Sequence, residues 1–130
     1  MKIERYHPNQ RMSQIVACGT TVYLAGQVAK DPAQDIEGQT SQILAQIDAL
    51  LAQVGSSKSQ LLAVTIWLAD IQDFPRMNQI WDAWVDPSNP PARACVQACL
   101  ARPELKVEMQ VTALRPYSDQ PVADCTGVEA

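Results

Sequence analysis

The sequence predicts an α+β fold in which a mixed β-sheet carries two helices on one face. Two observations lead to this prediction. Apolar residues recur at helical spacing in two separate segments, and the remaining segments have the β-branched or alternating pattern of strands. The order is β-β-α-β-α-β-β, and helices that link strands through crossovers pack on the sheet. A chain of 130 residues fits a single domain.

The first two strands are predicted at residues 14–18 and 21–29, where apolar and β-branched residues are separated by a glycine-containing turn. Gly26 lies inside the second run, which indicates a bulge or a close approach to the backbone. The polar segment 30–39 contains a proline and is predicted to be a loop.

The first helix is predicted from one apolar stripe, and Gly55 follows it, where helices commonly end in the left-handed conformation. The stripe consists of Ile43, Leu44, Ile47, Leu50, Leu51 and Val54. The strand at 63–70 is apolar at nearly every position, which predicts cover on both faces. The second helix is predicted at 73–85, with Asp73 as its cap and Pro75 in its first turn. Its buried stripe is Met77, Ile80, Trp81 and Trp84.

The last two strands are predicted at 93–100, interpreted as a buried strand, and at 106–114, where apolar and polar residues alternate. One sheet face then lacks a helical cover, and such a semi-apolar face predicts a closed cyclic oligomer. The domain is predicted to span 1–116, and the small polar residues of 117–130 predict a mobile tail.

The composition argues against several classes of protein. The net charge is −4 and no basic cluster occurs, so a nucleic-acid partner is not expected. The N-terminus has no apolar signal region, and no window approaches the ~18 apolar residues of a membrane span. We therefore expect a cytoplasmic protein whose four cysteines are reduced. With a single histidine and no C-x-x-C pair, neither a metal site nor a cofactor is expected.

Arg93 is the strongest candidate for chemistry, because a full charge stands at the start of an apolar strand after two prolines. A partly buried guanidinium needs an anionic partner. One interpretation is a salt bridge to Glu108, Asp82 or Asp86. The other is a substrate carboxylate held by two parallel N–H bonds.

Four further positions have two interpretations each. Glu108 would be partly buried and able to activate water in a central strand, or solvated in an edge strand. Cys95 shares the sheet face of Arg93 and is either a reactive thiolate or a packing residue. Asn78 is a ligand contact or an ordinary exposed polar residue. The Gly26-Gln27 pair brings backbone amides to a ligand or forms a bulge.

Four stretches, "YLAGQVAKDP", "DIQDFPRMNQIWDAW", "PPARACVQ" and "KVEMQVTAL", occur in the order and spacing of the Rid (YjgF-like) proteins. The likeness covers residues 12–115, and the tryptophan-rich helix resembles the YoaB-like branch most. The resemblance implies a fold like chorismate mutase (bacillus type) and a homotrimer packed through its sheets. It also implies ligand sites in the three clefts between subunits.

The resemblance implies a RidA-like, cofactor-free deaminase activity as well. Such proteins hydrolyse reactive enamine and imine acids, such as 2-aminoacrylate and 2-iminobutanoate, to 2-oxo acids and ammonia, which protects other enzymes from damage. In this likeness Arg93 holds the carboxylate, Glu108 positions water, Cys95 lines the cleft and Asn78 is the helix asparagine. The alternative is a non-catalytic module that binds a small carboxylate such as a 2-oxo acid.

Two positions depart from the best-known deaminases of that family. A tyrosine near the N-terminus is replaced by Met12, and a serine before the Gly-Gln pair is replaced by Ala25. Ser13 offers a substitute polar group beside Met12. The identity of the natural substrate is therefore open.

Overall fold

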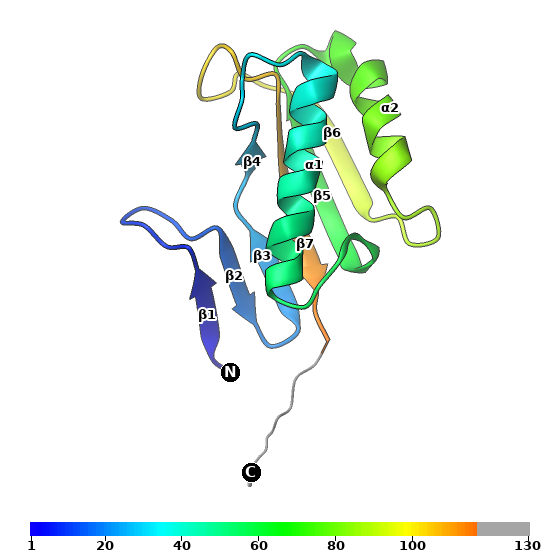
Figure 1. The fold of residues 1–130 in the computed structure, drawn as a ribbon. Coiled ribbons are helices and arrows are strands. Elements are labelled where there is room, and N and C mark those ends of the chain that lie inside the picture. The colour runs from blue at the N-terminus through cyan, green and yellow to red at the C-terminus, as the bar shows by residue number, and fades with distance from the viewer. Residues whose placement is uncertain (117–130) are drawn as a thin grey trace, which may run out of the picture.

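The computed structural model describes residues 1–116, so the tail predicted at 117–130 lies outside the described residues. A seven-stranded sheet has the order β1-β2-β3-β7-β5-β6, with β4 also paired to β7, and helices α1 and α2 lie on one face (Figure 1). All strand pairs are antiparallel except β5 with β6, which confirms the mixed sheet. The elements are β1 (Ile3–Tyr6), β2 (Ile15–Cys18), β3 (Thr21–Leu24), β4 (Gln27–Val28), α1 (Ile36–Gln53), β5 (Leu61–Leu68), α2 (Phe74–Trp84), β6 (Ala92–Gln97) and β7 (Val107–Leu114), with short 3-10 turns at Lys58–Gln60 and Ile71–Asp73.

The predicted N-terminal hairpin is confirmed as β2 and β3, but the second run is interrupted after Leu24 and resumes as β4. Strand β1 was not predicted. It pairs with β2 at the sheet edge, and its residues alternate between exposed and half-buried. Because no residue of β1 is fully buried, the strand lacks the apolar signal on which the prediction relied.

Helix α1 begins at Ile36, so the prediction of a loop through residue 39 was wrong over its last four positions. Asp35 is the N-cap, and its Oδ1 accepts a hydrogen bond of 2.8 Å from the backbone N–H of Gly38. The amide of Gln39 is buried and donates to the carbonyl of Glu104 over 3.1 Å, so a polar residue occupies the inner face of this first turn. At the other end Gly55 has φ of 76°, which confirms the left-handed position predicted there.

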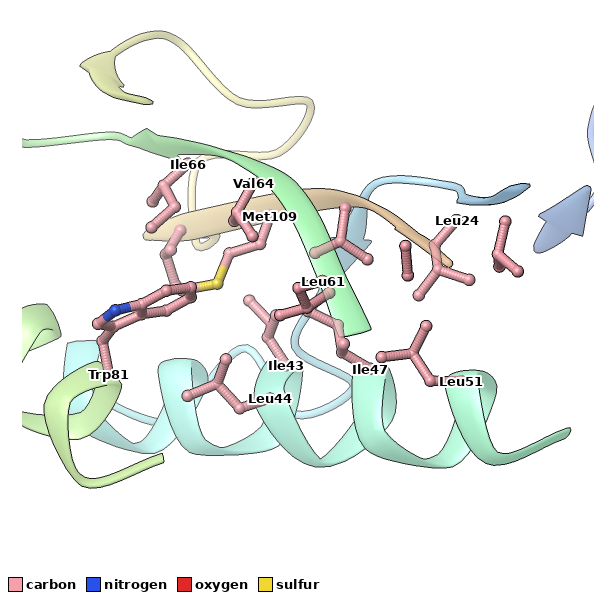
Figure 2. Packing of buried hydrophobic residues seen from close by; sticks show 14 of the residues in the cluster. Leu24, Ile43, Leu44, Ile47, Leu51, Leu61, Val64, Ile66, Trp81 and Met109 are labelled. Atoms are coloured by element: carbon pink, nitrogen blue, oxygen red, sulfur yellow. The ribbon is translucent and has the colours of Figure 1, made fainter. Parts of the chain in front are cut away.

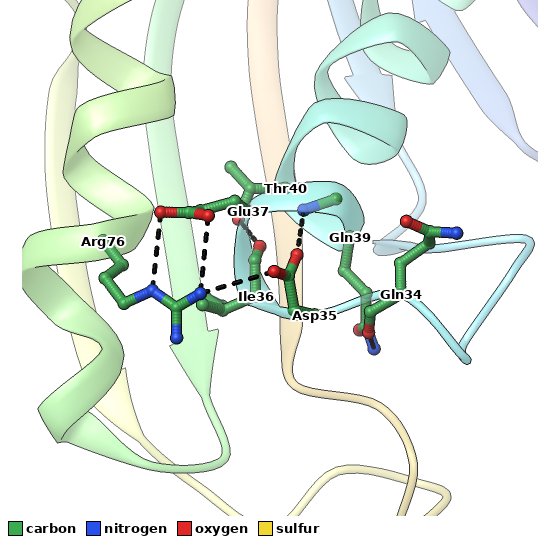
Figure 3. Close-up of polar contacts among 8 residues, drawn as sticks. Gln34, Asp35, Ile36, Glu37, Gln39, Thr40 and Arg76 are labelled. Carbon is green, nitrogen blue, oxygen red and sulfur yellow. Dashed lines mark hydrogen bonds and ion pairs between the residues drawn. The ribbon is translucent and has the colours of Figure 1, made fainter.

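Helix α2 confirms the prediction for 73–85 to within one residue at each end. Asp73 occupies the N-cap position, but its side chain makes no capping hydrogen bond within the described part of the chain. Arg76 instead connects the first turns of the two helices, with its Nη2 3.4 Å from carboxylate oxygens of Asp35 and Glu37 (Figure 3). These pairs are exposed and therefore contribute little stability.

The core lies between the sheet and the two helices, where the predicted stripe of α1 meets β3, β5 and β7 (Figure 2). Replacing the fully buried Ile47 with alanine is expected to lower the free energy of unfolding by about 2–5 kcal/mol, because a cavity remains in close-packed surroundings. Denaturant titration measures this effect. The exposed Ile71 is the control, since Ile71→Ala is expected to change stability by no more than about 0.5 kcal/mol. Equal effects of the two variants would contradict the described core.

No helix within residues 1–116 covers the face of the sheet opposite α1 and α2 (Figure 1). The single chain therefore lacks the cover predicted on both faces of 63–70 and the burial predicted for the strand at 93–100: Ala63 and Ala94 are exposed. Only cover by a further copy would supply either of them. Large apolar side chains also reach solvent here, with Tyr23 51% and Val96 49% exposed. The alternation predicted for 106–114 is confirmed, because alternate residues of β7 are buried toward the helices.

Candidate functional site

Arg93 lies on the helix-covered face of the edge strand β6. Its register partner in β5 is Val64, whose side chain belongs to the core. Its Nη1 donates a hydrogen bond of 2.9 Å to Oδ1 of Asn78 in α2. Its Cζ lies 5.1 Å from the ring centroid of Trp81 and 5.7 Å from that of Phe74. A neutral amide and two aromatic rings thus surround the guanidinium.

No ion pair within residues 1–116 includes Arg93, so the predicted salt bridge to Glu108, Asp82 or Asp86 was wrong for this part of the chain. Glu108 belongs to β7, which β5 separates from β6, and its side chain lies on the opposite sheet face. The carboxylate of Asp86 accepts hydrogen bonds from Ser59 and its own loop instead. The Arg93 charge therefore remains uncompensated within these residues.

Cys95 shares the face of Arg93, as predicted, and packs against the core. Burial raises the pKa of its thiol above the usual range, and the nearby Arg93 charge offsets this only in part. The thiol form is therefore favoured at neutral pH. Of the two interpretations, the packing residue agrees with this environment better than the reactive thiolate.

Glu108 is half-buried on the uncovered face of β7, a central strand with neighbours on both sides. It lies against Gly26. A Cβ atom added at residue 26 would collide with Oε2 of Glu108 and stand 3.2 Å from its Cδ. Of the two interpretations of Gly26, a bulge or a close approach to the backbone, the structure agrees with the close approach, and the approaching group is a side-chain carboxylate. The missing side chain at residue 26 provides the space that this carboxylate occupies.

Gln27 is buried, and its side-chain amide is used internally. Nε2 donates to Oε1 of Gln14 over 2.9 Å and to the carbonyl of Ala25 over 3.1 Å, while Oε1 accepts from Gln46 of α1. The side chain thus ties β4 and the segment before β2 to α1. These hydrogen bonds hold the backbone on either side of Gly26 in place.

Met12 and Ser13 lie in the loop between β1 and β2, where the backbone of Met12 exchanges hydrogen bonds with Asn9. Met12 is 42% exposed. Strands β3, β7 and β5 lie between β2 and β6, so this loop and Arg93 are near opposite edges of the sheet. Four strand spacings correspond to roughly 19 Å.

The predicted site residues thus form three groups: Arg93 with Cys95 and Asn78, Glu108 with Gly26 and Gln27, and the Met12-Ser13 loop. Gln14, the residue after Ser13, accepts hydrogen bonds from Gln27 and from the backbone of Ala25, so the loop adjoins the Glu108 group. The single chain keeps the Arg93 group apart from both. A cavity of about 560 Å³ lies elsewhere, beside Glu4 and Arg115, and one of about 380 Å³ lies between α1 and α2. Across residues 1–116, no cluster of three His, Cys, Asp or Glu side chains is arranged to hold a metal ion. Nor does that part of the chain contain a helix long and apolar enough to cross a membrane.

The sequence interpretation missed the contact of Arg93 with Phe74 and Trp81. Part of the signal was available, because Phe74, Asn78 and Trp81 are spaced i, i+4 and i+7 and so share one helix face, but this spacing does not identify Arg93 as the residue that the face contacts. Trp81 was assigned to the core stripe, and it is indeed buried. Its ring also forms part of the surroundings of the guanidinium.

Comparisons with known proteins are consistent over nearly the whole described chain. The family model described as endoribonuclease L-PSP matches residues 2–115. A RutC family protein of Haemophilus influenzae is 44% identical over 114 residues, covering 87% of this chain and 98% of that protein. The RutC family protein YoaB of Escherichia coli is 44% identical over 113 residues, again covering 87% of this chain and 98% of that protein. The crystal structure of NMB1025, a YjgF-family member from Neisseria meningitidis, has a TM-score of 0.87 at 41% identity, covering 89% of this chain and 97% of that one.

Proposed function

Because the chain belongs to the Rid (YjgF-like) family, we propose that it hydrolyses reactive 2-enamine and 2-imine acids, such as 2-aminoacrylate and 2-iminobutanoate, to 2-oxo acids and ammonia. One observation carries the proposal. Arg93 is half-buried, held in place by Asn78, and has no carboxylate partner within residues 1–116. Such a guanidinium is suited to bind a flat carboxylate through two parallel N–H bonds.

The working form in this proposal is a homotrimer. The exposed apolar side chains on the uncovered sheet face favour burial against further copies. In one chain Arg93 and Glu108 lie on opposite faces of the sheet, so a cleft completed by a neighbouring copy is needed to bring an arginine and a glutamate to one substrate. Arg93 of one subunit then faces Glu108 of the next.

The proposed reaction needs few groups. Arg93 orients the substrate through its carboxylate, and backbone groups near Gly26 or Cys95 polarise the imine nitrogen. Glu108 holds a water molecule and accepts its proton as the water oxygen attacks the carbon of the protonated imine, and it then returns that proton to the amine nitrogen. The resulting carbinolamine expels ammonia as the C=O bond forms. Imines hydrolyse spontaneously in water, so positioning supplies most of the modest acceleration required.

The departures at Met12 and Ala25 bear on the substrate rather than on the reaction. Met12 exposes a flexible apolar side chain where the resemblance implies a tyrosine hydroxyl. Ser13 offers the nearest hydroxyl in the same loop. In this proposal the loop selects among imine acids by their side chains. Arg93 and Glu108 act on the carboxylate and the imine carbon, which all of these substrates share.

The test generates 2-iminobutanoate in situ and measures ammonia release with and without the protein. We expect release above the spontaneous rate. Calorimetry with 2-oxobutanoate, the product, tests the alternative of a sensing module. Binding of 2-oxobutanoate without faster ammonia release would favour a sensor over an enzyme. If the protein neither binds 2-oxobutanoate nor accelerates ammonia release, both functions are contradicted.

The family description names an endoribonuclease, and that activity is not proposed for this chain. The net charge of −4 disfavours contact with a phosphate backbone, and lysine and arginine are scattered through the sequence. RNA binding that weakens steeply with added salt would reverse this judgement.

A further inference from the structure

We propose that Trp81, assisted by Phe74, is a positioning residue that holds the Arg93 guanidinium through cation–π contacts and so raises the affinity for the substrate carboxylate. The inference rests on the proposed function and adds to it a role for two aromatic residues. Arg93 remains the group that binds the anion. The aromatic rings act through it.

The distances support a direct interaction between the rings and the charge. The Cζ atom of Arg93 lies over both rings, 5.1 Å from the centroid of Trp81 and 5.7 Å from that of Phe74. Both values fall within the range of about 6 Å in which a ring quadrupole attracts a cation. Trp81 is nearly buried and Phe74 is 36% exposed, so the tryptophan contact is the better shielded from water and therefore the stronger one.

Trp81 is connected to helix α1 through Trp84. Its ring packs on that of Trp84 with centroids 5.4 Å apart and an interplanar angle of 52°. The indole Nε1–H of Trp84 donates a hydrogen bond of 2.9 Å to Oδ2 of Asp48 in α1. A continuous chain of contacts therefore runs from Asp48 through both tryptophans to Arg93. It fixes the guanidinium at the outer edge of the sheet, where no further strand of residues 1–116 lies beside β6.

The chemistry of these supports determines what Arg93 can do. A carboxylate partner would neutralise the guanidinium and occupy its N–H groups. Aromatic faces stabilise the positive charge without using any N–H group, and Asn78 accepts from Nη1 alone. Within residues 1–116 Arg93 makes no other side-chain hydrogen bond. The arrangement keeps a cation ordered and leaves N–H groups available for an anion, so its expected effect is on binding rather than on the reacting bond.

The experiment compares Trp81→Leu, Trp81→Phe and Phe74→Leu with the wild-type protein. Leucine fills space without a ring quadrupole, so Trp81→Leu is expected to raise both KM for 2-iminobutanoate and Kd for 2-oxobutanoate about 3- to 30-fold. The value of kcat is expected to stay within about twofold, because the reacting groups are untouched. Trp81→Phe should recover most of the affinity, and Phe74→Leu should show a smaller loss of the same kind.

Met77→Leu is the matched control, since Met77 is fully buried in the same helix and carries no aromatic ring. It should leave KM and Kd unchanged. If Trp81→Leu fails to fold, Phe74→Leu still tests whether an aromatic ring positions Arg93. Because Phe74 lies at the surface, this variant is expected to fold. Native Kd values in Trp81→Leu and Phe74→Leu, or a loss confined to kcat, would overturn the positioning role. Weakened 2-oxobutanoate binding in a protein whose wild type releases no ammonia would support the role and refute the proposed hydrolysis.

Discussion

Arg93→Ala is expected to lower kcat/KM for imine hydrolysis by about 100-fold or more, to the point where ammonia release approaches the spontaneous rate. The substitution removes the only cation placed in this part of β6 and leaves the substrate carboxylate without its charged partner. Removing one member of a hydrogen-bonded charge pair costs about 2–5 kcal/mol, or about 30- to 5,000-fold in rate, and the expected loss lies within this range. Arg93→Lys should recover only part of the loss, because an ammonium cannot form two parallel N–H bonds to one carboxylate.

The control for Arg93→Ala is Arg102→Ala, which removes another arginine from the same chain. Arg102 is exposed and pairs with Glu104 over 3.5 Å, outside the three groups of site residues. It should retain native kinetics. Circular dichroism and the mass in solution establish that both variants keep the fold and the oligomeric state of the wild-type protein. If Arg93→Ala keeps its assembly and still releases ammonia at the wild-type rate, Arg93 does not hold the substrate and the proposed mechanism is wrong.

The architecture was predictable because its signals are local. The stripe from Ile43 to Val54 defines a helix by its period, and Gly55 marks the end of that helix by its backbone conformation. The alternation in β7 predicts which of its residues are buried. The start of α1 was not predictable by the same route, since its first turn buries polar residues such as Gln39 whose partners come from distant loops.

The arrangement of the site depends on strand order, which no local pattern supplies. The residue types at 93 and 108 suggested either a salt bridge between them or two parts of an active site. Strand β5 lies between their strands, and the two side chains lie on opposite faces of the sheet, which excludes the salt bridge within one chain. The contact of Arg93 with Trp81 was missed for a related reason. A tryptophan at helical spacing predicts burial, but the spacing alone does not reveal which strand residue it covers.

Glu108→Gln is expected to lower kcat about 100-fold while KM changes little. The amide keeps the size of the carboxylate but cannot accept a proton from water, and general base catalysis contributes about 10²–10⁴-fold. Steady-state kinetics with 2-iminobutanoate measures the separation of kcat from KM. The opposite outcome, in which KM rises and kcat is native, would place Glu108 in substrate binding instead.

Gly26→Ala tests the same carboxylate without altering it. The added methyl group would occupy the position of Glu108 Oε2, so the carboxylate must move, and kcat is expected to fall in the direction of the Glu108→Gln value. Gly26 is not among the glycines with positive φ, so alanine brings no backbone strain. Gly55→Ala is the reverse control. Its φ of 76° makes alanine strained, although the added Cβ would meet no atom of residues 1–116 within 4 Å. The substitution should therefore lower stability while leaving kcat native.

A double-mutant cycle separates displacement of Glu108 from general damage to the backbone. In a Glu108→Ala background the space beside residue 26 is empty, so the methyl group of Gly26→Ala has nothing to displace. Its effect on kcat should therefore vanish there, which makes the two substitutions strongly non-additive. If Gly26→Ala lowers kcat by the same factor in both backgrounds, the glycine acts independently of the carboxylate. The space that Gly26 leaves for Glu108 would then have no part in the reaction.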